Sequence, residues 1–81
     1  MPKIRPEVIM SATLEVSKSL PAGSRFRASK VRDHLHLPVG RWYNEAIREC
    51  WRQNQAWLVS HGLRLISEPK RKVTWWYLVR E

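Results

Sequence analysis

The chain has 81 residues, of which 43% are hydrophobic and five are tryptophan. This length predicts one domain over residues 1–81. The single cysteine, Cys50, excludes an internal disulfide and favours a reducing compartment such as the cytoplasm. No apolar run approaches the roughly 20 residues of a membrane helix, so no membrane segment is expected.

The net charge is +8 at pH 7, because fifteen lysines and arginines face seven aspartates and glutamates. The pI is close to 10.6. A small domain with a pI above about 9 is a reasonable nucleic-acid binder. The alternative is a basic protein that docks on an acidic partner protein, and charge alone does not separate the two.

The first predicted element is a helix over residues 6–20. Pro6 suits the first helical position, where its missing N–H has no intrahelical partner, and Glu7 suits the positive end of the helix dipole. Apolar or small side chains follow at helical spacing, namely Ile9, Ala12, Thr13, Val16 and Leu20. The sequence "PAG" at 21–23 ends the helix.

A short strand or an extended link is expected at residues 24–29, where Phe26 lies between two arginines. Ser29 is the predicted N-cap of a second, short helix over residues 30–37, with the sequence "KVRDHLHL". Val31 and Leu35, with His34 beside them, are expected to line one side of this helix. "LPVG" at 37–40 then breaks the chain.

The longest predicted helix covers residues 41–61. Its apolar stripe is interrupted by Asn54 and contains Tyr43, Ala46, Ile47, Cys50, Trp57 and Leu58. The opposite face is polar and contains Arg41, Glu45, Arg48, Arg52 and Gln55. Gly62 is expected to cap the helix in the left-handed conformation.

Two β-rich segments, 63–67 and 73–79, are joined by the polar loop "EPKRK" at 68–72, which predicts a hairpin. In the second strand, Trp75, Tyr77 and Val79 alternate with Thr74, Trp76 and Leu78. Both faces therefore carry aromatic side chains, and the pattern does not indicate which face packs on the helices.

The order of elements resembles a winged helix-turn-helix domain over about residues 6–80. "SRFRASKVRDHLHLPVGRWYNEAIRECW" has the layout of a strand, a helix, a turn and a recognition helix, and "LRLISEPKRKVTWWYLVR" has the layout of a wing. The resemblance implies an α+β fold of three helices, a C-terminal two-stranded β-hairpin wing, and a short strand between the first two helices.

The resemblance also implies binding of double-stranded DNA by a transcriptional regulator, with the third helix in the major groove. The DNA-binding candidates on that helix are Arg41, Asn44, Arg48 and Arg52. The candidates at the wing tip, expected on phosphates, are Lys70, Arg71 and Lys72, and those around the start of the second helix are Arg25, Arg27 and Lys30. Each set also has a plainer interpretation, as a solvated helix face, a solvated turn or an ordinary helix start.

Two other functions remain open from the sequence. Winged-helix domains also bind proteins, and an exposed Trp42, Trp51 or Trp76 would suit such an interface. Bases of single-stranded nucleic acid could stack on Trp75 and Trp76. The regulator hypothesis itself allows a homodimer. An enzyme is not expected, since no catalytic motif, cofactor loop or metal-ligand pattern is present, and "HLH" at 34–36 is a weak metal signal.

Overall fold

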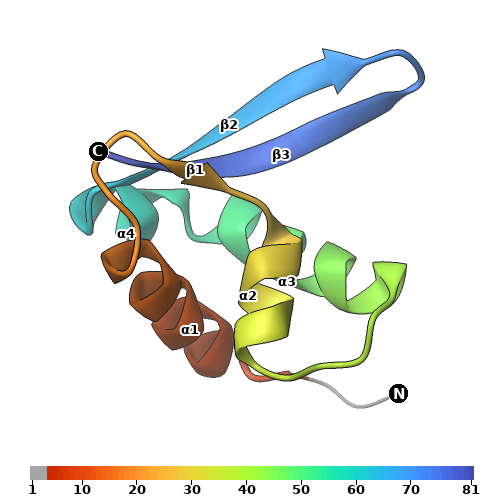
Figure 1. The fold of residues 1–81 in the computed structure, drawn as a ribbon, viewed down its shortest axis with the longest axis horizontal. Helices are drawn as coiled ribbons and strands as arrows, with labels where there is room; N and C mark the ends of the chain where they lie inside the picture. Colours follow the sequence, from red (N-terminus) through yellow and green to blue (C-terminus); the bar gives the residue numbers. More distant parts are fainter. Residues whose placement is uncertain (1–3) are drawn as a thin grey trace.

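Four helices and three strands make up residues 4–81, the part of the chain that this computed structural model describes. Figure 1 shows the helices gathered on one side of the sheet. The elements are, in chain order, α1 (Pro6–Lys18), β1 (Arg25–Phe26), α2 (Ala28–His34), α3 (Arg41–Gln53), α4 (Gln55–Ser60), β2 (Leu63–Lys70) and β3 (Val73–Arg80). The fold is α+β.

The three strands form one antiparallel sheet in the order β1-β3-β2. The predicted C-terminal hairpin is present as β2 and β3, but it is not a separate two-stranded unit. β1 pairs with the end of β3, where Phe26 lies opposite Leu78. Leu65 of β2 lies opposite Leu78 from the other side. The face with Leu78 and Trp76 therefore points toward the helices, and the face with Trp75 and Tyr77 points away.

Trp51 is the centre of the core, although the sequence analysis left it off the apolar stripe. It is fully buried, and its ring meets Phe26 edge-on with the ring centroids 6.0 Å apart. Its Nε1–H donates to the hydroxyl of Thr13 at 3.0 Å, and that hydroxyl donates to the carbonyl of Ile9 at 2.7 Å. The one polar atom of the indole is thus satisfied inside the core, which removes the cost of burying it.

The predicted single helix 41–61 is wrong, because the chain breaks at Asn54. The Asn54 side-chain amide donates to the carbonyl of Cys50 at 2.7 Å, the acceptor that the Asn54 backbone N–H would use in a continuous helix. That N–H bonds Trp51 instead, at 3.1 Å. A new helix, α4, then begins at Gln55, and its side chains do not continue the faces of α3. Leu58 is buried, but Trp57 is 36% exposed and stacks on His61, so the prediction of a core Trp57 is also wrong.

α2 differs from the prediction at both ends, because it begins at Ala28 instead of Lys30 and ends at His34 instead of Leu37. Arg27, not Ser29, is the N-cap residue, and it makes no side-chain cap hydrogen bond. Ala28 is buried in the core, and this packing brings the helix start forward by two residues. His34 is exposed, because its ring nitrogen lies 2.7 Å from the Glu15 carboxylate of α1 rather than against the core.

The remaining boundaries follow the sequence more closely. α1 ends at Lys18, two residues before the predicted end. β2 extends to Lys70, so only Arg71 and Lys72 remain in the turn of the hairpin. Gly62 has a φ of 77°, which confirms the predicted left-handed cap. Among residues 4–81, no helix has both the length and the apolar character that a membrane crossing requires.

Candidate nucleic-acid interface

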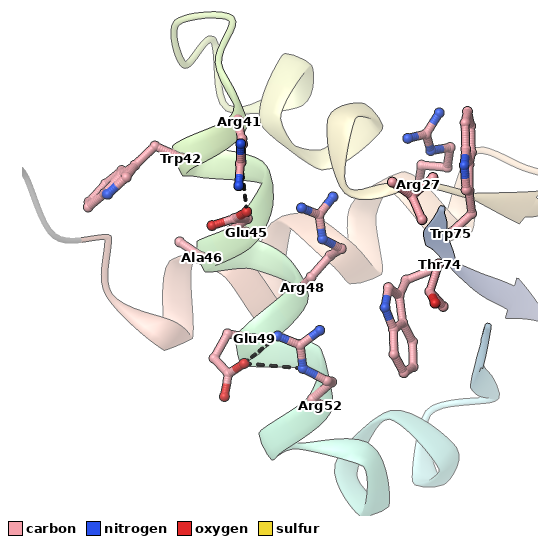
Figure 2. A pocket seen from close by; sticks show the side chains of 12 residues that line it. Arg27, Arg41, Trp42, Glu45, Ala46, Arg48, Glu49, Arg52, Thr74 and Trp75 are labelled. Carbon is pink, nitrogen blue, oxygen red and sulfur yellow. Dashed lines mark hydrogen bonds and ion pairs between the residues drawn. The ribbon is translucent and has the colours of Figure 1, made fainter. Parts of the chain in front are cut away.

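A groove runs between α3 and the far half of β3. β1 pairs with β3 only at Leu78 and Val79, so the edge of β3 before those residues has no strand beside it there. In Figure 1 the hairpin extends beyond the helices on the side where α3 begins. We call the hollow between them the Arg–Trp groove; it is lined by Arg27, Arg41, Trp42, Glu45, Ala46, Arg48, Glu49, Arg52, Val73, Thr74, Trp75 and Trp76 (Figure 2).

Two of the four arginines in the groove are paired with glutamates of α3. The Nε of Arg41 lies 3.1 Å from Glu45, one turn along the helix. The Nε of Arg52 lies 3.1 Å from Glu49, and a second nitrogen of the same guanidinium also bonds it. These bonds from Arg52, followed by its charge, hold the pKa of Glu49 below its ordinary value. Both pairs are drawn as dashed lines in Figure 2.

Arg48 has no hydrogen bond or ion pair within residues 4–81, although it is partly buried in the middle of the groove. Burial is the main cause that lowers the pKa of its guanidinium below its ordinary value. Glu45 opposes this shift, while Arg52, Arg27 and Arg41 add to it through their positive charges. Arg48 thus lies among three other arginines, and Glu45 offsets part of their positive charge.

The tryptophans of β3 lie under two of the arginines. The guanidinium carbon of Arg27 is 3.7 Å from the centre of the Trp75 ring, a close cation–π stack. Arg52 lies 5.5 Å from the centre of the Trp76 ring, which is a looser contact. Like Arg48, the Arg27 side chain has no acidic partner among the described residues, so its N–H donors remain available.

Asn44 is the predicted α3 residue that the structure separates from the others. Its side-chain oxygen accepts a hydrogen bond from Nη1 of Arg32 at 3.2 Å, so it is turned toward α2. It does not line the groove. Arg41, Arg48 and Arg52 do share the groove, and Arg27 from the start of α2 joins them.

The hairpin turn presents the other predicted cations. Lys70 lies 3.9 Å from Glu68 and 5.1 Å from the centre of the Trp75 ring. Arg71 and Lys72 are exposed and form no ion pair within residues 4–81. Arg71 has a φ of 52°, a left-handed conformation that favours glycine. The end of the hairpin is therefore cationic, as predicted.

Arg25 and Lys30 lie away from the groove. Arg25 is ion-paired with Glu68 on the outer face of the sheet, and its guanidinium carbon is 4.6 Å from the centre of the Tyr77 ring. Lys30 is exposed and lines a different, shallow hollow with Arg25 and Tyr77. Arg27 lines this second hollow as well as the groove, and it is the only one of the three predicted cations around the start of α2 that belongs to the groove.

The sequence did not indicate that Trp75 and Trp76 line the same groove as the arginines. Strand alternation places Trp75 and Trp76 on opposite faces, which hides the fact that both line one hollow. The signal that could have found it is the brevity of "RF", because so short a strand leaves most of β3 uncovered. Trp42 also lines the groove; it is 38% exposed and packs edge-on against Tyr43.

Within residues 4–81, no group of three histidine, cysteine, aspartate or glutamate side chains is placed to hold a metal ion. Comparison of the chain with protein-family models, with curated proteins and with solved structures found no match.

Proposed function

We propose that this protein binds double-stranded DNA as a small transcriptional regulator of the winged helix-turn-helix type. In this proposal α3 enters the major groove, and the hairpin turn contacts the DNA backbone. The observation that carries it is the Arg–Trp groove, where arginines from two helices face the uncovered edge of β3 (Figure 2).

The arrangement of elements supports the architecture. A helix, a short strand, three helices and a hairpin follow one another in the described residues, and the short strand pairs with the second strand of the hairpin. That order matches the layout of a recognition helix followed by a wing. The extra helix α4 is a departure, but it lies after α3 and leaves the first turns of α3 free.

The distribution of charge supports DNA as the ligand. Arg41 is at the start of α3, and its side chain is 89% exposed, so its pairing with Glu45 can be exchanged for a base or a phosphate at small cost. Arg71 and Lys72, at the far end of the hairpin, form no ion pair with any residue from 4 to 81. Surfaces of this kind neutralise phosphates, and the released counterions drive the binding.

The test is binding to a random-sequence duplex across a salt series. We expect log K to fall steeply with log salt, by about 0.9 for each phosphate neutralised. Replacing Lys70, Arg71 and Lys72 together by glutamine should flatten the slope by about one to three units. It should weaken binding to all DNA sequences by a similar factor. Absence of duplex binding, or affinity that survives high salt, would exclude the proposal.

One observation favours a second candidate, a protein-binding module. Trp42 and Val39 are both exposed, and they lie close together in the chain before and within the first turn of α3. An exposed tryptophan beside cations suits an acidic partner protein. In that case Trp42→Ala would abolish binding to the partner, and the duplex titration above would show no interaction.

A further inference from the structure

The four arginines of the Arg–Trp groove fall into two pairs with different neighbours. Arg41 and Arg52 are each bonded to a glutamate one turn away on α3. Arg27 and Arg48 have no acidic partner within residues 4–81, although both line the same hollow. The groove therefore contains two arginines that are paired with glutamate and two that have no acidic partner among these residues.

The two free guanidiniums come from different elements, and the fold directs both into the groove. Figure 2 shows Arg48 projecting from the middle of α3, with Arg27 and Trp75 across from it. The Trp75 ring lies 3.7 Å from the Arg27 guanidinium carbon, which restricts that side chain to a flat, stacked position. A guanidinium held in this way loses less conformational entropy when it forms hydrogen bonds with a ligand.

The charges identify the class of ligand. Arg27, Arg41 and Arg52 all act on Arg48 with like charge, and only Glu45 acts against them. A neutral base edge offers acceptors to one guanidinium but no formal charge to offset the repulsion between two. A phosphodiester carries a full negative charge and two unesterified oxygens, so each guanidinium can donate to an oxygen.

We propose that Arg27 and Arg48 together hold one phosphate of a DNA backbone, with Trp75 as the positioning residue for Arg27. We name this arrangement the Arg27–Arg48 clamp. It rests on the proposed function, because it takes DNA as the ligand. It goes further by giving Arg48 a phosphate rather than a base, and by excluding the glutamate-paired Arg41 and Arg52 from the same contact.

The first experiment compares variants that remove one positive charge each. Arg27→Gln and Arg48→Gln should each weaken binding to a random-sequence duplex by about tenfold, the usual effect of losing a charge-assisted hydrogen bond. Arg41→Gln is the matched control, because it removes the same charge from the same groove. It should cost only about two- to threefold, since a DNA contact of Arg41 replaces its existing ion pair with Glu45, whereas Arg27 and Arg48 have no acidic partner to give up within residues 4–81.

The double variant Arg27→Gln/Arg48→Gln distinguishes one shared phosphate from two separate ones. If the clamp holds a single phosphate, the double variant should bind little worse than either single variant. Its salt slope should fall by about one unit and not by two. Multiplied losses with a drop of about two units, or losses no larger than that of Arg41→Gln, would overturn the clamp. Thermal melts verify that each variant is folded.

The second experiment separates the clamp from the proposed function. Arginine Nε–Hε resonances are followed by NMR as a short single-stranded oligothymidylate, the duplex, or pyrophosphate is added. We expect the Arg27 and Arg48 resonances, assigned from the two single variants, to shift together with either DNA. Replacing one arginine should abolish the shift of the other.

The outcomes of the NMR titration are distinct. If the duplex does not bind but both resonances shift with the oligothymidylate, the proposed function fails and the clamp stands. If other groove resonances shift while those of Arg27 and Arg48 stay in place, the clamp fails, whatever the duplex does. If pyrophosphate binds as tightly as the oligothymidylate, the ligand is a free phosphate compound and the assignment to a nucleic-acid backbone is wrong.

Discussion

Tryptophans occupy two contrasting regions of this molecule. Trp51 lies in the core, fully buried, edge-on to Phe26 and hydrogen-bonded to Thr13. Trp75 and Trp76 lie in the Arg–Trp groove, partly exposed, with an arginine over each ring. The same residue type thus stabilises the fold in one place and supports charged side chains in the other.

The difference between these regions lies in what surrounds each ring. In the core, the indole removes apolar area from water, and its N–H is satisfied internally. In the groove, the ring faces interact with guanidiniums that would otherwise be mobile. A core tryptophan should therefore affect mainly the free energy of unfolding, and a groove tryptophan should affect mainly binding.

The largest expected effect is on stability, at Trp51. Trp51→Ala should reduce the free energy of unfolding by about 3–5 kcal/mol, enough to unfold much of so small a protein. The matched control is Trp57→Ala, which removes an identical side chain that is 36% exposed on α4. It should cost about 1 kcal/mol or less. Urea denaturation followed by fluorescence measures both.

Equal losses at the two positions would contradict the contrast between them. Trp51→Phe sharpens it further, because phenylalanine keeps most of the apolar volume but lacks the N–H that donates to Thr13. The lost hydrogen bond and the smaller ring together should cost about 1–3 kcal/mol, less than the alanine variant.

The sequence pattern placed Trp57 in the core and left Trp51 off the apolar stripe, whereas Trp51 is buried and Trp57 is exposed. These two residues show where sequence reasoning about the fold succeeded and failed. Helical spacing predicted the extent of α3 up to Asn54, because the period of an unbroken helix is fixed. It failed beyond, since the break depends on one side-chain hydrogen bond, from Asn54 to the Cys50 carbonyl. After the break, Leu58 stays in the core as predicted, but Trp57 does not.

The second prediction concerns the groove. Trp75→Leu keeps an apolar side chain but removes the ring that holds Arg27. It should lower stability by only about 1 kcal/mol, the usual size of an exposed cation–π contact. Duplex affinity should fall by a factor similar to that of Arg27→Gln, and adding Arg27→Gln to Trp75→Leu should change it little further. A large loss of stability with unchanged duplex affinity would show that Trp75 stabilises the fold and does not support DNA binding.

The candidate site was predictable in part. Arginines spaced seven and four residues apart on one helix must share a face, so Arg41, Arg48 and Arg52 were identified correctly as a group. The sequence could not show that Arg41 and Arg52 are bonded to glutamates whereas Arg48 is free, because pairing depends on rotamers. Nor could it show that Arg27, distant in sequence, stacks on Trp75.

The third prediction separates strain from charge at the hairpin turn. Arg71 has a φ of 52°, whereas Lys72 does not have a positive φ. Arg71→Gly should stabilise the protein by about 0.5–1 kcal/mol, because glycine adopts that conformation without steric cost. Lys72→Gly should not stabilise it. Both variants lose one charge, so both should weaken duplex binding by a similar, small factor.

Thermal melts and the salt series measure the two effects separately. Stabilisation at both positions would mean that the turn does not depend on the φ of residue 71. A loss of affinity at only one position would show that the hairpin turn contacts the backbone through a single cation.

The smallest expected effect concerns Cys50 in the core and the pH dependence of the free energy of unfolding. Burial of Cys50, aided by the charge of Glu7 and opposed by a hydrogen bond from Asn54, raises the pKa of its thiol above 9.0. A raised pKa means that the unfolded chain loses the thiol proton first. The resulting stabilisation is fully present below the unfolded pKa and is lost as pH rises through the folded pKa.

Stability should therefore decline slightly as the pH rises above about 9, and Cys50→Ala should lack that part of the decline. The comparison uses the difference between parent and variant, because tyrosines and lysines titrate in the same range and contribute equally to both. A thiol reagent provides a second measurement: native Cys50 should react much more slowly than the urea-unfolded chain at the same pH. A native thiol that reacts as fast as the unfolded one would place Cys50 outside the core that Trp51 defines.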